Sequence, residues 1–306
     1  MSTNRFTLPS FAKINLFLRI KGKRTDGFHE LCTVFQTVSL KDNLTFSEHS
    51  ELILTCDTER IPLDDRNLII KAANLLKGKY EVKTGAKIHL VKNIPSPGGL
   101  GGGSSNAAVA LLGLIKLWNI EIDFANLVKL GKLLGSDVPF FFYGGTAIGT
   151  GRGTEIFTRE EISEKNILIV TPGVNVSTAA AFGCVNVRHL TNNSSKRILQ
   201  ICRHEAGSTL LQQSLLKNDF EEIVFKLEPE IERVKKSLLL NGAKTALMSG
   251  SGASVFGIFE NEKHLQTAFN NLKSERDWRV FPVQTVSRPN YFESLKHFDS
   301  LLRTDC

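Results

Sequence analysis

A glycine-rich segment that runs directly into an apolar helix constrains this chain more than any other stretch. The segment extends from Pro95 to Asn106, and five of its residues are glycine. From Ala107 to Leu117 the apolar residues recur at helical spacing. A glycine-rich loop at the start of a helix presents free backbone N–H groups and the positive end of the helix dipole, which together bind phosphate. The segment therefore predicts a phosphate-binding loop.

The end of this segment also offers polar side chains. Ser104, Ser105 and Asn106 are candidate N-caps of the helix. The two serine hydroxyls would offer donors to phosphate oxygens, or an oxygen to a magnesium ion that the phosphates carry. A flexible linker is excluded because the loop continues into a helix of buried character, whereas tight packing against a neighbouring strand stays open. G-x-x-x-x-G-K-[ST] and G-x-G-x-x-G are absent, which excludes a P-loop and weakens a dinucleotide site.

Composition narrows the class of protein. The 306 residues are enough for one large domain or two ordinary ones. Hydrophobic residues make up 42% and charged residues 23%, which is typical of a globular protein. The net charge of +7 suits an anionic ligand or a nucleic acid. Nucleic acid is the weaker interpretation, because the densest basic cluster, 21–24, is short and the other basic residues are scattered.

Cysteine usage and hydropathy predict a cytoplasmic protein. The five cysteines include no C-x-x-C pair, which favours reduced thiols. The apolar run 11–20 contains Lys13, Asn15 and Arg19, so it does not resemble a signal peptide. No uncharged apolar stretch reaches membrane-spanning length, and we therefore expect no membrane association.

The run from Phe11 to Ile20 alternates as a strand does. Ala12 and the apolar residues in phase with it form one face, the expected core side, whereas Lys13 and Asn15 lie on the other. Residues two apart on a strand are separated by about 7 Å on the same face, so Lys13 and Asn15 project side by side. A solvated outer face is the alternative, and it would hold for most strands of this pattern.

The dipeptide Asp26-Gly27 is a turn signal, and Phe28 and His29 follow it at the mouth of the next predicted strand. An aromatic ring beside an imidazole can form a stacking platform with a hydrogen-bonding edge. It can equally be ordinary packing with a polar tip. The residues alone favour neither interpretation.

Asp137 stands between the end of a predicted helix and a strongly apolar aromatic run, 138–143. A carboxylate in this place would be partly desolvated, and a lysine beside it would keep it ionised. That setting suits a general base. Asp137 can also be a turn residue that accepts hydrogen bonds from its own backbone.

The remaining pattern indicates an α+β fold with two layers. Strands are expected at 11–20, 34–40, 44–46, 52–56, 86–91, 147–153, 155–157, 167–171, 244–248, 255–260 and 280–286. Helices are expected at 67–77, 107–117, 124–134, 176–182, 198–216, 220–227, 230–240 and 262–272, with a loop at 188–196. The polar stretch 159–165 is the candidate boundary, which gives an N-terminal domain 1–158, a C-terminal domain 159–290 and a tail 291–306.

Three stretches of the chain resemble the GHMP small-molecule kinases: Pro9–Leu16, Pro95–Asn106 and Ser249–Gly252. Asp26–His29 and Gly135–Pro139 make the chain similar to those members that act on a cytidine diphosphate–linked methylerythritol. The similarity extends over nearly the whole chain, and the combination is far more specific than any single stretch. It implies a two-domain GHMP kinase-like fold with the active site in the cleft between the domains.

The resemblance implies ATP-dependent phosphorylation of the 2-hydroxyl of that small-molecule substrate, a step of non-mevalonate isoprenoid synthesis, with ATP and Mg²⁺ as cofactors. It implies Lys13 and Asp137 as the catalytic pair. Asp137 would accept the hydroxyl proton, and Lys13 would keep Asp137 ionised and face the developing charge. We expect such a kinase to be a monomer or weak homodimer that binds no nucleic acid.

The resemblance also implies the remaining site residues. Those for the substrate are Asn15, Phe28, His29, Thr178 and Phe182. Phe28 and Phe182 would stack on the cytosine, and His29 would hydrogen-bond its edge. Those for ATP are Pro95, Ser96, Pro97, Gly98, Gly99, Leu100, Gly101, Gly102, Gly103, Ser104, Ser105, Asn67 and Lys92. No carboxylate ligand for magnesium is indicated, so ATP oxygens and water would be its main ligands.

Two residues depart from the family pattern. Pro97 stands where glycine is usual, and because proline fixes φ and lacks an N–H, the loop entrance is stiffer and offers one donor fewer. Phe28 stands where tyrosine is common, which keeps the stacking surface and removes a hydroxyl.

Two rival functions remain. One is another GHMP kinase, acting on mevalonate, homoserine or a sugar, and Asp26–His29 argues against it because those substrates carry no base. The other is a non-catalytic nucleotide-binding sensor, and the intact Lys13 and Asp137 argue against that.

Overall fold

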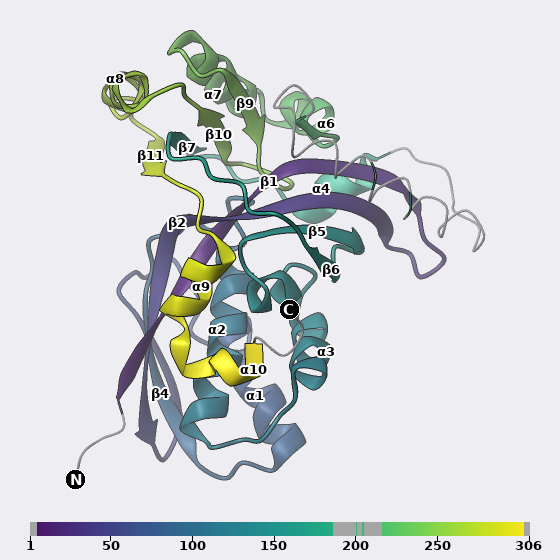
Figure 1. Ribbon diagram of the computed structural model, residues 1–306, viewed down its shortest axis with the longest axis vertical. Helices are drawn as coiled ribbons and strands as arrows, with labels where there is room; N and C mark the ends of the chain where they lie inside the picture. Colours follow the sequence, from purple (N-terminus) through teal and green to yellow (C-terminus); the bar gives the residue numbers. More distant parts are fainter. Residues whose placement is uncertain (1–4, 186–199, 201–203, 205–215, 303–306) are drawn as a thin grey trace.

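The computed structural model describes residues 5–185, 200, 204 and 216–302, whose elements form two sheets flanked by helices (Figure 1). The strands are β1 (Phe6–Lys23), β2 (His29–His49), β3 (Leu52–Cys56), β4 (Gly85–Val91), β5 (Thr146–Gly151), β6 (Glu155–Thr158), β7 (Ile167–Pro172), β8 (Lys217–Asn218), β9 (Thr245–Met248), β10 (Val255–Ile258) and β11 (Trp278–Val283). The helices are α1 (Leu68–Tyr80), α2 (Gly102–Leu117), α3 (Phe124–Leu134), α4 (Thr178–Gly183), α6 (Glu221–Leu227), α7 (Pro229–Leu240), α8 (Glu262–Leu272), α9 (Arg288–Ser294) and α10 (Asp299–Leu302), with 3-10 helices η1 (Val138–Phe142) and η3 (Lys296–Phe298). The predicted α+β class is confirmed.

The larger sheet, within the described residues, has seven strands. β3, β4, β2, β1 and β8 follow one another, while β5 pairs with β2 and β6 pairs with β5. β1 and β2 form a long antiparallel hairpin with shifts of register at Phe11/Ala12, Asn15/Phe17 and Ile20/Gly22. Such irregularities bend a strand and increase its twist. The two halves of β2 pair with different strands, 43–49 with β4 and 31–36 with β5.

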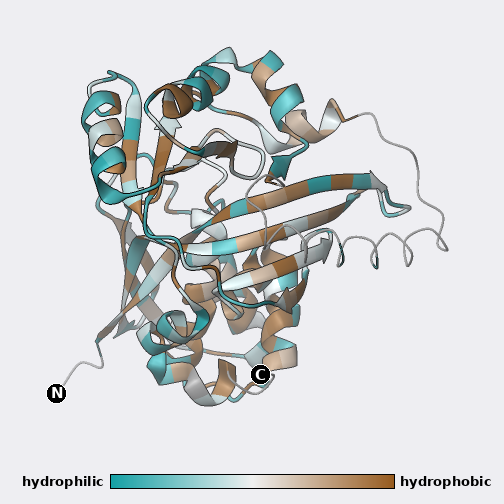
Figure 2. Ribbon diagram, turned by 45° about the horizontal axis from the view of Figure 1, so that its top comes forward, coloured by the Kyte–Doolittle hydropathy of each residue, from teal (hydrophilic) through white to brown (hydrophobic). Residues whose placement is uncertain are grey.

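The smaller sheet has the order β11-β7-β10-β9 in the described part of the chain, and each neighbouring pair is antiparallel. One face packs on α6, α7 and α8, and these helices carry many hydrophilic residues on the outside of the molecule (Figure 2). The other face packs on β1, where Ile169 and Phe256 share a core cluster with Ala12 and Ile14. Successive side chains along these strands therefore contribute to two different core clusters, one on each face of the sheet.

β1 is covered on both of its faces. Its apolar side meets the smaller sheet, and the opposite side carries Lys13 and Asn15, which are only 2% and 1% exposed. The alternative of a solvated outer face is therefore wrong. The alternation of polar and apolar residues along a strand contains no information about which later segments cover its polar side. In this structure, loops from later in the chain cover it.

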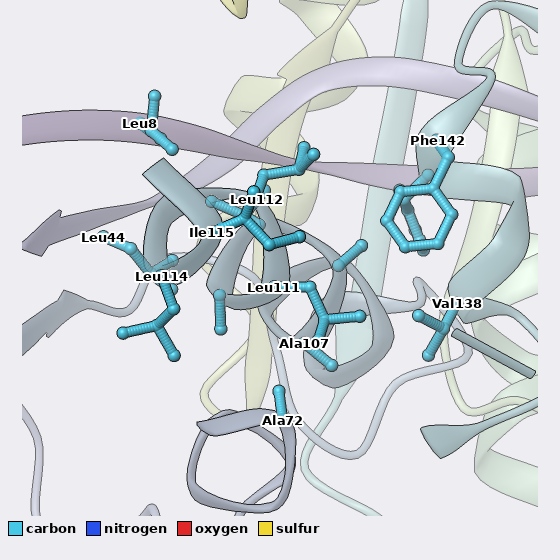
Figure 3. Close-up of a cluster of buried hydrophobic side chains, with 14 of the residues drawn as sticks. Leu8, Leu44, Ala72, Ala107, Leu111, Leu112, Leu114, Ile115, Val138 and Phe142 are labelled. Atoms are coloured by element: carbon cyan, nitrogen blue, oxygen red, sulfur yellow. The ribbon is translucent and has the colours of Figure 1, made fainter. Parts of the chain in front are cut away.

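α2 is the central helix of another cluster of buried hydrophobic residues, which also includes residues of α1, β2 and β4 and is called the first core cluster (Figure 3). Leu111 and Ile115 belong to this cluster together with Leu44 of β2 and Ala72 of α1. Gly113 permits the close approach of helix and sheet, because a Cβ there would overlap the Phe46 ring. The helix is buried on nearly all sides, which positions its N-terminus firmly.

α2 begins earlier than predicted, at Gly102, and its N-cap is Gly101 with φ 69°. The prediction of Ser104, Ser105 or Asn106 as the N-cap is wrong, because all three lie within the helix. Glycine adopts a left-handed φ without steric cost, so the loop can turn sharply into the helix.

The segment 288–302, most of which was assigned to a tail of unspecified structure, contains helices. It forms α9, η3 and α10 and returns to the first core cluster, beside α2 in Figure 1. Tyr291 is fully buried, and its hydroxyl donates a 2.6 Å hydrogen bond to the Phe141 carbonyl. Burial raises the pKa of this hydroxyl above its ordinary value. α9 therefore packs on the layer that carries η1.

Two predicted segments lie wholly or mostly outside the described residues, namely the loop 188–196 and the helix 198–216. The predicted division at residues 158 and 159 stays a prediction. Within the described ranges, none of the helices combines the length and apolar character needed to cross a bilayer.

Candidate active site

A cavity of about 770 Å³ opens where loops of the two sheets meet. Its lining comes from β1, β2, the glycine-rich loop, the turn before η1, the region of α4 and the loop between β9 and β10. The predicted site residues that line it are Lys13, Asn15, Phe28, His29, Pro97, Gly98, Gly99, Gly101, Ser104, Asp137, Thr178 and Phe182. The cavity thus brings together segments from both predicted domains.

Lys13 and Asp137 form an ion pair in this cavity. The Lys13 Nζ lies 3.3 Å from the Asp137 Oδ2, and the side chains are 3% and 33% exposed. Lys13 Nζ also donates to Asn15 Oδ1 at 2.6 Å and to the Gly99 carbonyl at 3.0 Å. The ammonium is therefore held by three acceptors, while the carboxylate remains open to the cavity. Asp137 directly precedes η1, whose residues are all buried, so its backbone is firmly anchored.

Asn15 is fixed from two sides. Its Nδ2 donates to the Thr33 hydroxyl at 2.7 Å, which in turn donates to the Phe17 carbonyl at 2.8 Å. Its backbone N–H donates to the Ser249 hydroxyl at 3.2 Å. With its Oδ1 taken by Lys13, Asn15 is a preorganised part of the site.

The glycine-rich loop approaches the cavity at positions that only glycine suits. Gly99 has φ +71°, and a Cβ on it would overlap the Ser249 carbonyl oxygen. Gly101 has φ +69°, and a Cβ there would lie 2.9 Å from Phe141 Cζ. Gly98, Gly99, Gly101 and Ser104 line the cavity at the N-terminus of α2. The loop therefore places backbone donors and one hydroxyl at the positive end of a sixteen-residue helix.

The other predicted ATP residues do not line this cavity. They are Pro95, Ser96, Leu100, Gly102, Gly103, Ser105, Asn67 and Lys92. Asn67 is the N-cap of α1, since its Oδ1 accepts from the Ile69 N–H at 2.9 Å, and its Nδ2 donates to the Pro62 carbonyl at 2.7 Å. In this structure Asn67 thus has a local structural role.

Ser105 and Lys92 belong to a buried polar network behind the loop. Lys92 Nζ donates to Asp42 Oδ2 at 2.6 Å, and Asn106 Nδ2 donates to the same oxygen at 2.9 Å. Asn106 also donates to the Ser10 hydroxyl, which donates to the Ser105 hydroxyl at 2.8 Å. Burial lowers the pKa of Lys92, although Asp42 opposes that shift. This network ties the first turn of α2 to β1 and β2, so of the two serines only Ser104 faces the cavity.

Aromatic rings surround the mouth of the cavity. The His29 and Phe182 rings are stacked at 5.0 Å, and Phe182 meets Phe220 edge-on at 4.7 Å. Burial lowers the pKa of His29 below its ordinary value, and the charge of Lys23 lowers it further. Phe28 is 50% exposed. The two rings expected to enclose a base are therefore both present, although Phe182 here stacks on His29.

Arg152 lines the same cavity and was missed by the sequence. Its guanidinium carbon lies 3.6 Å from the centre of the Phe28 ring, and its Nη2 donates to Asp26 Oδ2 at 3.0 Å. Partial desolvation raises the pKa of Asp26, but hydrogen bonds from Arg152, the Phe28 N–H and Arg24 lower it below its usual range. Nothing about an arginine between two glycines could have revealed this contact.

The loop between β9 and β10 contributes Gly250, Ser251 and Gly252, none of which the sequence assigned a role. The Ser251 hydroxyl lies 2.9 Å from the Thr178 hydroxyl. Asn218 holds the loop from behind, since its Nδ2 donates to the carbonyls of Met248 and Gly250. The similarity of Ser249–Gly252 to a third glycine-rich motif was the signal that could have placed them.

This arrangement can transfer a phosphoryl group. A carboxylate open to the cavity can take the proton of an alcohol. A buried ammonium and the N-terminus of α2 can oppose the charge of the group in transfer. Among the described residues no cluster of three His, Cys, Asp or Glu side chains could hold a metal ion. The hydroxyl of Ser104 and the carboxylate of Asp137 are oxygen donors of the kind that Mg²⁺ accepts, so they fit a magnesium ion brought by a nucleotide.

Two family models match this chain. Residues 67–145 match the model described as "GHMP kinases N terminal domain", and residues 200–276 match "GHMP kinases C terminal". A protein of Bacillus mycoides named 4-diphosphocytidyl-2-C-methyl-D-erythritol kinase is 39% identical over 264 residues, which is 86% of this chain and 91% of that protein.

Solved structures agree with these matches. A crystal structure of 4-(cytidine 5'-diphospho)-2C-methyl-D-erythritol kinase superposes with a TM-score of 0.73 and 30% identity, covering 92% of this chain and all of that one. A homoserine kinase from Cytophaga hutchinsonii reaches a TM-score of 0.66 at 18% identity, covering 93% of this chain and 96% of that one, which shows the shared fold alone.

Proposed function

This chain belongs to the GHMP kinases, among the 4-diphosphocytidyl-2-C-methyl-D-erythritol kinases, and from that premise we propose how its cavity phosphorylates the 2-hydroxyl of 4-diphosphocytidyl-2-C-methyl-D-erythritol with ATP. The reaction serves non-mevalonate isoprenoid synthesis. The observation that carries the proposal is the Lys13–Asp137 ion pair, which shares a cavity with the glycine-rich N-terminus of α2.

Asp137 is the general base. Its carboxylate is open to the cavity and accepts the proton of the 2-hydroxyl as the oxygen attacks phosphorus. Lys13 keeps that carboxylate ionised and opposes the charge that develops on the transferring group. Because Asn15 and Gly99 hold the ammonium in place, Lys13 needs no reorganisation during the reaction.

The glycine-rich loop binds the phosphates of ATP. Backbone N–H groups of Gly98, Gly99 and Gly101 and the dipole of α2 favour the negative charge. A magnesium ion bound with the nucleotide would supply Lewis-acid stabilisation of the phosphoryl oxygens, and the hydroxyl of Ser104, which lines the cavity, would hold it. Ser105 supports the loop from behind through Ser10.

The mouth of the cavity binds the cytidine. Phe28 offers an exposed ring for stacking, and His29 offers a ring nitrogen to the edge of the base. Phe182 supports the His29 ring in this structure. Asn15 and Thr178 contact the sugar-alcohol portion near the reacting oxygen.

The proposal also includes the location of the protein in the cell, its oligomeric state and its partners. Reduced cysteines favour a cytoplasmic enzyme, and Cys32, Cys56 and Cys184 are free in the structure. The scattered basic residues favour a small anionic substrate over nucleic acid. We propose a monomer or weak homodimer without a membrane partner.

An ATP-consumption assay tests the proposal. We expect turnover with the cytidine-linked methylerythritol and none with mevalonate or homoserine. Cytidine diphosphate should inhibit by competing with the substrate. Turnover with mevalonate and no inhibition by cytidine diphosphate would instead place the chain with another specificity of the fold. ATP binding without turnover on any substrate would favour a nucleotide sensor.

A further inference from the structure

Phe28 is a half-exposed ring that nevertheless has one face covered. The Arg152 guanidinium carbon lies 3.6 Å from the ring centre, which is van der Waals contact. An exposed aromatic side chain after a turn is otherwise free to change rotamer. A cation over the face of the ring holds it in one orientation. Because a guanidinium in contact leaves no room for a base between them, a stacked base has only the opposite face of Phe28.

Arg152 is itself held in place. Its Nη2 donates to Asp26 Oδ2 at 3.0 Å, and Asp26 Oδ1 accepts from the Phe28 N–H at 3.1 Å. One carboxylate therefore anchors both the guanidinium and the backbone of the residue whose ring it covers. Asp26, Phe28 and Arg152 form a closed triangle of contacts at the mouth of the cavity.

The triangle is attached to the sheet through Glu30, which is 1% exposed. Its Oε1 accepts from the Gly151 N–H at 3.0 Å, directly before Arg152. Its Oε2 pairs with Arg24, which also contacts Asp26 at 3.3 Å. A single buried carboxylate thus fixes the backbone beside Arg152 and the partner of Asp26.

We propose that Arg152 is a positioning residue for recognition of the pyrimidine. It holds the Phe28 ring so that one face is presented to the base of a cytidine nucleotide, and it acts through the ring rather than on the phosphates. The inference rests on the proposed function and adds to it the residue that sets the orientation of the stacking platform. It predicts that the loss on removing Arg152 falls on the nucleoside portion of the substrate.

The test compares Arg152→Met, Arg152→Lys and a matched control, Arg233→Met. Arg233 also lies over an aromatic ring, 4.3 Å from Trp278, and also pairs with carboxylates, but it is outside the cavity lining. Steady-state kinetics give KM for the cytidine substrate and for ATP. Inhibition constants for cytidine and for cytidine diphosphate separate the nucleoside from its phosphates.

We expect Arg152→Met to raise KM for the cytidine substrate by about two- to fivefold, the range of an exposed cation–π contact. Cytidine and cytidine diphosphate should weaken as inhibitors by the same factor, with KM for ATP unaffected. Arg152→Lys should restore part of the loss, and Arg233→Met should change none of these constants.

Three results would overturn the inference. They are a loss for cytidine diphosphate but not for cytidine, which would make Arg152 a phosphate ligand, an equal rise in KM for ATP, or unchanged constants in Arg152→Met. Failure of the proposed function is distinguishable, because the unaltered protein would then show neither turnover of the cytidine substrate nor inhibition by cytidine.

Discussion

The Ser249 hydroxyl donates a 2.9 Å hydrogen bond to the Gly99 carbonyl, across 150 residues of sequence. The same carbonyl accepts from Lys13 Nζ at 3.0 Å. The glycine-rich loop, β1 and the loop between β9 and β10 therefore meet at one backbone oxygen. Displacing any of these parts would move the ammonium that faces Asp137.

Gly99→Ala tests how tight this junction is. The substitution strains a left-handed φ and drives a Cβ into the Ser249 carbonyl oxygen, so we expect a loss of stability above about 2 kcal/mol together with loss of ATP binding. Gly78→Ala is the control, since Gly78 lies in α1 with open space around it and should gain about 0.5–1 kcal/mol. Chemical denaturation compares the two, and equal stabilities would contradict the close approach.

Asp137→Asn removes the base and keeps the shape of the side chain. We expect a folded protein that binds ATP with turnover reduced by about 10²–10⁴-fold, the usual contribution of a positioned base. Nucleotide titration and kcat should be measured on the same preparation. Turnover within a factor of two of the unaltered protein would remove Asp137 from the mechanism.

The two buried lysines should separate catalysis from stability. Lys92→Met leaves the fully buried Asp42 without its cation, which we expect to cost about 3–5 kcal/mol of unfolding free energy. Lys13→Met leaves a carboxylate that water still reaches, so the loss should fall on kcat, by about a hundredfold or more. Thermal unfolding and steady-state kinetics on both variants measure this contrast, and a reversed pattern would be incompatible with the assigned roles.

His29 should give the substrate affinity a pH dependence. Its pKa is lowered by burial and by Lys23, so the ring is mostly neutral at pH 7 and becomes half-protonated only below the ordinary pKa of about 6.5. KM for the cytidine substrate should change little above about pH 7 and rise as the pH falls through the lowered pKa. In His29→Gln the rise should vanish. An NMR titration of Lys23→Gln should show a higher pKa for His29 than in the unaltered protein. An unchanged pKa would exclude an effect of the Lys23 charge.

Ser104 and Ser105 should respond differently to alanine. Ser104 lines the cavity, and Ser104→Ala should raise the magnesium concentration needed for half-maximal rate by several-fold. Ser105 accepts from Ser10 away from the cavity, and Ser105→Ala should lower stability by about 1 kcal/mol with the magnesium dependence intact. Magnesium titrations of activity decide between them; matching curves for the two variants would argue against the assignment of Ser104.

Patterns formed by neighbouring residues in the sequence were sufficient to predict much of this fold. Helical spacing predicted α2 after Asn106 and α3 at 124–134, and in the structure Asp123 caps α3 by accepting from the Asn126 N–H. The α+β class and the family also followed from the sequence. These features depend on residues that are neighbours in the chain or on motifs that are contiguous.

What could not be predicted depends on distant contacts. For Lys13 and Asn15, the strand pattern alone left a solvated face open, because the loops that bury them come from much later in the chain. Gly101 replaced the expected serine cap because the entry of the loop, rather than a side chain, sets the start of α2. Arg152 contacts the Phe28 ring only because the pairing of β5 with β2 brings it beside the Phe28 turn.

The return of α9 and α10 to the first core cluster has a consequence for the order of assembly. That cluster contains Leu8 near one end of the described chain and Leu302 near the other. During synthesis on the ribosome, the layer that carries the glycine-rich loop emerges first, yet its packing is incomplete until Tyr291 and Leu302 have emerged. The smaller sheet lies between these two ends in the sequence, so all of its strands are synthesised before the last residues of the first core cluster are added.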